Sequence, residues 1–179
     1  MLRAGGLAAA VIFALVAWRL VVPQKGVVMC AAIASVLFAL TDLAIEHAAN
    51  IHGIWVCIGS FQVAHVPALM LAQFVFQGIG FCLVMYAVMR RRRGARLFVD
   101  MSLLSVALAF ILFMLEFVWR DMGVTIYLKP YTWVYVLLAW NALLAVLFST
   151  FYLGIKTFIG TDGILSKQQV RDQGAKEGN

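Results

Sequence analysis

Side chains capable of acid–base chemistry or ligand binding are concentrated in one stretch of this sequence, residues 41–67. The stretch holds two carboxylates, the three histidines of the chain, a tryptophan and a cysteine: Asp42, Glu46, His47, His52, His65, Trp55 and Cys57. Asp42 and Glu46 are four residues apart and share a helix face, so they could act as an acid–base pair or bind a polar ligand. His47 and His52 lack a metal-ligand spacing and no HExxH motif is present, so we predict no metal site and no cofactor.

The rest of the composition is that of a membrane protein. Of the 179 residues, 64% are hydrophobic and only 12% are charged, against about 25% charged in soluble domains. Apolar runs of roughly 18 or more residues predict membrane spans, which must be helical to satisfy their backbone hydrogen bonds. The sequence therefore predicts an all-α, polytopic membrane protein whose main partner is the lipid bilayer.

Charge and cysteine content exclude other classes. The net charge of +6 could indicate nucleic-acid binding, but the basic residues lie at predicted helix ends and in the tail, so we expect no nucleic-acid partner. Three cysteines lie far apart without a CxxC motif, which indicates neither a zinc site nor a disulfide scaffold.

Five transmembrane helices follow from the apolar runs and form a single membrane domain, residues 1–159. Their predicted spans are about 5–22, 27–46, 67–89, 97–118 and 131–158. A loop is expected after the second span, with its short apolar piece 54–58 at the membrane interface. Proline is tolerated in a first helical turn, so Pro67 and Pro130 are expected to open the third and fifth helices. The polar residues 160–179 are expected to form a cytoplasmic tail, with a surface helix over 164–173 as the alternative.

Basic residues predict the orientation through the positive-inside rule. With the arginine cluster inside, the inner side holds eleven basic residues: Arg19, Lys25, Arg90, Arg91, Arg92, Arg93, Arg96, Lys156, Lys167, Arg171 and Lys176. The outer side holds three: Arg3, Arg120 and Lys129. We therefore predict that the N-terminus lies outside the membrane and the C-terminus inside.

Several ionisable residues are expected at one depth near the outer surface. Intramembrane ionisable groups mark functional sites by default, which predicts a pocket between the second, third and fourth helices. Its predicted lining is Asp42, Glu46, His47, His65 and Glu116, with Trp55 and Arg120 as further ligand-binding candidates. Asp42, Glu46 and Glu116 are the catalytic candidates. The alternative is an interfacial rim, where these groups only meet water and headgroups.

Near the membrane midplane the strong hydrogen-bonding side chains are Gln73, Gln77 and Asn141. Gln77 and Asn141 lie about equally far from the starts of their helices. We expect them to have a structural role, with a hydrogen bond between helices. A substrate path along these amides is the alternative.

The order of these features resembles an uncharacterised family of small five-helix membrane proteins of Gram-positive, mostly spore-forming bacteria. The resemblance covers about residues 41–135 and rests on these residues: Glu46, Gly53, Trp55, Pro67, Tyr86, Glu116, Gly123, Tyr127, Trp133 and Tyr135. The chain departs from the family pattern after Tyr86 and Glu116, where Ala87 and Phe117 replace the usual Gln and Pro. The resemblance implies five helices and singles out Glu46 and Glu116, and the family has no assigned activity.

Three hypotheses for function remain open. The first is a non-enzymatic membrane protein that binds a lipid-like or small polar ligand, or serves a membrane complex. The second is a membrane-embedded enzyme on a lipid or isoprenoid substrate, with a protonated Asp42 or Glu46 as general acid and Glu116 or a histidine as base. The third is a small transporter or channel, for which the inverted repeats and midplane charges typical of transporters are not found in the sequence.

Overall fold

The computed structural model describes residues 2–58, 61–92, 94–121 and 125–160. These residues form five helices: α1 (Leu2–Val21), α2 (Lys25–Ile51), α3 (Ala68–Arg91), α4 (Gly94–Asp121) and α5 (Thr132–Phe158). All five are long and apolar enough to cross a membrane. The predicted all-α class and the number of long helices are confirmed, while the predicted tail lies outside the described residues from position 161 onward.

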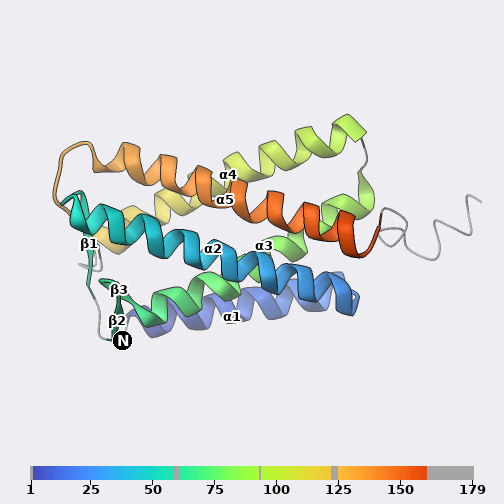
Figure 1. The fold of residues 1–179 in the computed structure, drawn as a ribbon, viewed down its shortest axis with the longest axis horizontal. Coiled ribbons are helices and arrows are strands. Elements are labelled where there is room, and N and C mark those ends of the chain that lie inside the picture. The colour runs from blue at the N-terminus through green and yellow to red at the C-terminus, as the bar shows by residue number, and fades with distance from the viewer. Residues whose placement is uncertain (1, 59–60, 93, 122–124, 161–179) are drawn as a thin grey trace, which may run out of the picture.

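α2 runs through the middle of the bundle and packs against both α3 and α5. α1 covers the other side of α3, and α4 packs mainly on α5 (Figure 1). The outer helices α1 and α4 are therefore the least buried of the five. This arrangement leaves α1 and α4 on either side of α3, where a cavity opens.

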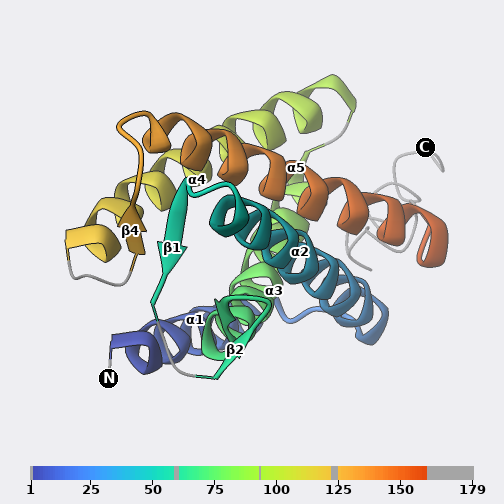
Figure 2. The same ribbon diagram turned by 60° about the vertical axis from the view of Figure 1, so that its left-hand side comes forward.

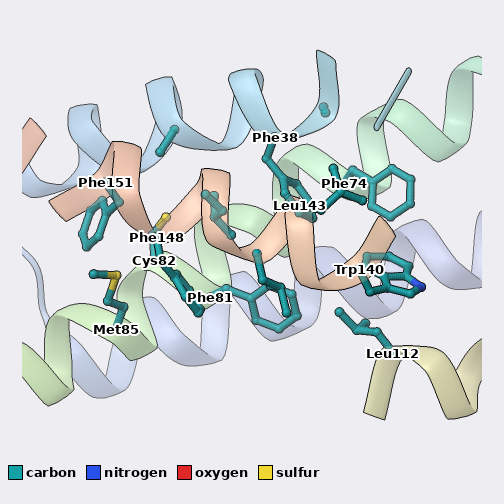
Figure 3. Packing of buried hydrophobic residues seen from close by; sticks show 14 of the residues in the cluster. Phe38, Phe74, Phe81, Cys82, Met85, Leu112, Trp140, Leu143, Phe148 and Phe151 are labelled. Carbon is teal, nitrogen blue, oxygen red and sulfur yellow. The ribbon is translucent and has the colours of Figure 1, made fainter. Parts of the chain in front are cut away.

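Aromatic rings from three helices form the centre of the core (Figure 3). Phe74 of α3 meets Phe38 of α2 edge-on at 5.8 Å between ring centroids and Trp140 of α5 at 5.6 Å. Such edge-to-face pairs stabilise a core beyond their buried area. Leu143 and Leu144 of α5 are also fully buried, so the core joins α2, α3 and α5 into one unit.

Two glycines of α3 bring its neighbours unusually close. A Cβ placed on Gly78 would lie 2.8 Å from Ser35 Oγ and 3.2 Å from Ser35 Cα on α2. A Cβ on Gly80 would overlap the ring of Phe13 on α1. Small residues at these positions let helix backbones approach, as in other membrane bundles.

Four short strands lie at the end of the bundle that also holds the N-terminus (Figure 1). β1 (Trp55–Cys57) pairs antiparallel with β4 (Thr125–Tyr127), and β2 (Gln62–Val63) pairs with β3 (Val66–Pro67) in a hairpin. Figure 2 shows β1 and β4 side by side, connecting the loop after α2 to the loop after α4.

This end of the molecule differs from the sequence-based expectation in two respects. α2 continues to Ile51, five residues beyond the predicted end of the second span at Glu46. Polar residues after Glu46 were interpreted as a loop, but residues such as His47 and Ala48 are compatible with a helix that protrudes from the membrane. The apolar piece 54–58 was expected at the membrane interface, and its residues 55–57 instead form a strand that pairs with β4.

Candidate functional site

The two-stranded sheet of β1 and β4 covers one end of the bundle. Its opposed residue pairs are Trp55 with Tyr127, Val56 with Ile126, and Cys57 with Thr125. Side chains alternate between the two faces of a strand, and directly opposed residues share a face. Trp55, Cys57 and Thr125 are buried, so the face that carries them, together with Tyr127, looks into the bundle. The inward face of the sheet therefore carries the indole of Trp55, the thiol of Cys57 and the hydroxyls of Thr125 and Tyr127. These groups lie near the acidic residues at the ends of α2 and α4.

Glu46 connects this sheet to α2. Its Oε2 accepts hydrogen bonds from Trp55 Nε1 at 2.6 Å and from Cys57 Sγ at 3.1 Å. Both donor side chains are buried, so the two contacts join β1 to α2 away from solvent. The sequence analysis named Trp55 as a ligand-binding candidate, and the structure brings its indole to this carboxylate. Glu46 therefore anchors β1.

Asp42 lies one turn before Glu46 on α2 and is buried, with only 3% of its surface exposed. Its Oδ2 has no hydrogen-bond partner among the described residues. Glu46 and Glu116 are both close enough to act on it electrostatically. The three carboxyl groups that the sequence singled out are therefore gathered at one end of the bundle, from α2 and α4.

Tyr127 and Arg120 lie near this acidic group. Burial raises the pKa of the Tyr127 hydroxyl, and the nearby charge of Glu116 raises it further. The Tyr127 hydroxyl oxygen has no hydrogen-bond partner in the described part of the chain. Arg120 forms a salt bridge with Asp121 at 2.8 Å, and its guanidinium lies over the rings of Phe117 and Tyr127 at 5.1 and 5.8 Å from their centroids.

Two histidines predicted to line the pocket lie elsewhere. The rings of His47 and His65 stack on each other at 5.7 Å, and His47 Nδ1 is 3.1 Å from the carbonyl oxygen of Ala64. His65 occupies the turn of the β2–β3 hairpin, with φ of 66°, and is exposed to solvent. The side chain of His47 is half-buried and that of His65 is exposed, and neither lies in the wall of the cavity described below.

A cavity of about 510 Å³ lies between α1, α3 and α4, with Trp140 of α5 and Thr125 of β4 completing its wall. Its polar side chains are Gln73, Gln77, Glu116 and Thr125. The remaining lining is apolar: Gly5, Gly6, Ala9, Ala10, Phe13, Met70, Phe74, Phe81, Leu108, Ile111, Leu112, Leu115, Val118 and Trp140. This cavity is bounded by α1 as well as by α3 and α4, and of the five residues predicted to line a pocket, Glu116 is the one that its wall contains.

The amides near the midplane do not pair as expected. Asn141 Nδ2 donates to the carbonyl oxygen of Leu137 in its own helix at 2.8 Å. Gln77 of α3 lines the cavity, and its buried Oε1 has no hydrogen-bond partner within the described residues. Equal depth in two helices does not determine which way each side chain points. Gln77 therefore belongs to the cavity and Asn141 does not.

A second hollow of about 820 Å³ lies on the other face of α4, near its end and the start of α5. Two basic residues, Arg120 and Lys129, lie on its rim, and aromatic rings of Phe117, Tyr127 and Trp133 form much of its wall. Lys129 Nζ donates to the carbonyl oxygen of His52 at 3.2 Å, which fixes the lysine beside the end of α2. We call this hollow the basic groove.

No known protein family model, curated protein or solved structure matches this chain. Its site is therefore assigned from geometry. Among the described residues, no three His, Cys, Asp or Glu side chains are arranged to hold a metal ion.

The sequence analysis did not predict that α1 would line the cavity. Gly5, Gly6, Ala9 and Ala10 form one wall of the cavity, and their lack of bulk leaves room for it. The signal was present as small residues at helical spacing on the first span. Thr125 was also missed, although it lines both the cavity and the basic groove.

Proposed function

We propose that this chain is a multi-pass integral membrane protein that binds a lipid-like ligand in the cavity between α1, α3 and α4. The length and apolar character of the five helices support membrane insertion. The observation that carries the binding proposal is Gln77, a residue that lines the cavity and whose buried acceptor Oε1 has no hydrogen-bond partner among the described residues. Buried polar atoms in native structures are almost always hydrogen-bonded, so such an acceptor points to a ligand or water as donor.

The lining favours a ligand with a hydrogen-bond-donating head and a hydrocarbon tail. Glu116 and Gln77 both offer acceptor oxygens, and no Lys or Arg lines the cavity among the side chains that the structure describes. An anionic head would meet Glu116 in the cavity wall, and like charges at one site are disfavoured. A hydroxyl or an ammonium group would be accepted, with the tail against Phe81 and Leu108 deeper in the cavity. The cavity volume of about 510 Å³ falls within the range of small-molecule sites.

This proposal predicts selectivity for the head group. Purified protein should bind hexadecanol and hexadecylamine more tightly than hexadecanoic acid, measured as ligand-induced thermal stabilisation in one detergent. Gln77→Leu should weaken hexadecanol binding about tenfold, the equivalent of one lost hydrogen bond. The same change should leave the stability of the ligand-free protein nearly unchanged, because Gln77 Oε1 makes no hydrogen bond to the described protein.

Two tryptophan substitutions on α1 provide the matched control. Ala10 lines the cavity, so Ala10→Trp should fill it and remove hexadecanol binding. Ile12 lies on the exposed face of α1, with 61% of its surface accessible, so Ile12→Trp should bind like the wild type. Equal binding by both variants, or a preference for the fatty acid, would contradict a cavity site.

The orientation is proposed from the distribution of basic residues. Eleven lie on one predicted side and three on the other, which supports an external N-terminus and a cytoplasmic C-terminus in a bacterial plasma membrane. Reporter fusions after Arg93 and after Asn179 should both indicate the cytoplasm, and a fusion after Gly59 should not. A cytoplasmic signal from the Gly59 fusion would reverse this topology. The resemblance to five-helix proteins of Gram-positive bacteria supports the number of helices and the bacterial plasma membrane as their location.

A membrane enzyme is the second candidate, and the gathering of Asp42, Glu46 and Glu116 favours it. A general acid or base must come within hydrogen-bond reach of the reacting group. Glu116 meets this condition for a ligand in the cavity, whereas Glu46 is bonded to Trp55 and Cys57. Ligand binding requires only the cavity, so it is the function that the geometry supports best. A converted lipid product in mass spectra of protein incubated with hexadecanol or a polyisoprenol would favour the enzyme.

A further inference from the structure

The basic groove differs from the cavity in charge and lies on the opposite face of α4. Arg120 and Lys129 stand on its rim. Phe113 and Phe117 lie below Arg120 along α4, and Phe113 is seven residues before it, or about 10 Å deeper at the helical rise of 1.5 Å per residue. The groove therefore has a cationic end and an apolar wall that continues into the candidate span Ala95–Val118.

The basic residues are held in place but retain unused donors. Arg120 uses Nε and Nη2 for Asp121, and the rings of Phe117 and Tyr127 lie beneath its guanidinium. Its Nη1 makes no hydrogen bond among those found in the described part of the chain. Lys129 Nζ carries three protons and donates to the carbonyl oxygen of His52. Both cations can therefore donate to an anion in the groove without breaking their present contacts.

We infer that the basic groove binds the phosphate headgroup of an anionic phospholipid. Arg120 and Lys129 match the charge of a phosphate oxygen group, and guanidinium–phosphate contacts are favoured by geometry as well as charge. Trp133 is half exposed at the rim, and tryptophan prefers the headgroup level of a membrane. The wall of Phe113 and Phe117 lies where the first carbons of an acyl chain would follow the headgroup. A free phosphate would make no contact with this apolar wall. We therefore assign the phosphate to a phospholipid, whose acyl chain can contact the wall.

This inference is independent of the cavity ligand. None of the residues that carry it, Arg120, Lys129, Phe113, Phe117 and Trp133, lines the cavity. Loss of phospholipid from the groove would therefore leave the head-group selectivity of the cavity unchanged. Loss of hexadecanol binding in the cavity would likewise leave phospholipid retention in the groove unchanged.

Native mass spectrometry of the full chain released from nanodiscs tests the groove. With equal phosphatidylglycerol and phosphatidylcholine present, the wild type should retain phosphatidylglycerol preferentially. Arg120→Gln and Lys129→Gln should each lower that retention, and the double variant should lower it at least about tenfold, as expected for lost charge-assisted hydrogen bonds. Asp121→Ala should act in the opposite direction and raise retention, because it removes the carboxylate to which Nε and Nη2 of Arg120 donate.

Lys156→Gln is the matched control, since Lys156 is an exposed lysine in the last turn of α5, away from the groove. It should retain phosphatidylglycerol like the wild type, and all variants should keep the wild-type unfolding temperature within a few degrees. Equal retention of both lipids by the wild type, or an equal loss in Lys156→Gln, would overturn the inference. Displacement of phosphatidylglycerol by inorganic phosphate at matched concentration would also overturn it, because the groove would then bind the free anion without using its apolar wall.

Discussion

Replacing Gly78 by alanine should lower the free energy of unfolding by about 1–3 kcal/mol, the usual cost of an extra methyl in a packed core. The added Cβ would lie 2.8 Å from Ser35 Oγ, 3.0 Å from Ser35 Cβ and 3.2 Å from Ser35 Cα. The hydroxyl could rotate away, but the Cα belongs to the backbone of α2, so α2 and α3 would have to separate. Thermal or denaturant unfolding in a single detergent measures the change.

Two further variants separate crowding from the general effect of alanine in a helix. A Cβ on Gly5 meets nothing within 4 Å, so Gly5→Ala should be neutral or slightly stabilising. Ser35→Gly removes the two nearest side-chain atoms, so the double variant should recover part of the stability lost in Gly78→Ala. If Gly78→Ala were as stable as Gly5→Ala, the close approach of α2 and α3 would be refuted.

The helices of this protein could be predicted because each membrane span needs a long apolar run and must form its backbone hydrogen bonds within itself. The five runs are separated by short polar segments, so their number and approximate bounds follow from hydropathy alone. The end of α2 was missed because hydropathy locates the edge of the apolar layer and not the end of a helix. His47 and the residues after it are polar, yet they continue the helix to Ile51.

Contacts between distant segments were less predictable. β1 and β4 are separated by almost seventy residues and are three residues long each, too short for their alternation to be distinguished from a loop. Depth along a helix could be counted, which correctly brought Asp42, Glu46 and Glu116 to one end. The sequence does not determine how each helix is rotated about its own axis relative to its neighbours, and so which neighbour a side chain faces. That is why Gln77 was expected at Asn141 and instead lines a cavity with α1.

Glu46→Leu should destabilise the protein by about 3 kcal/mol, because it leaves Trp55 Nε1 and Cys57 Sγ without the acceptor they share. Trp55 is buried, so its indole N–H would have no water to replace the carboxylate. The loss should extend beyond β1. β1 pairs with β4, and Thr125 of β4 lines both the cavity and the basic groove. Hexadecanol binding and phosphatidylglycerol retention should therefore both weaken in this variant.

Glu46→Gln is the matched control for Glu46→Leu. The glutamine side chain keeps an acceptor oxygen of similar reach, so its cost should be less than half that of leucine, and both ligands should still bind. A double-mutant cycle of Glu46→Gln with Trp55→Phe isolates the contact between the two side chains, and a coupling energy above about 0.5 kcal/mol is expected for residues in direct contact. If Glu46→Leu unfolds at the wild-type temperature, Glu46 does not anchor the sheet. If the Glu46→Leu variant is destabilised but binds both ligands normally, Glu46 stabilises the sheet and has no effect on the structure of the cavity or the basic groove.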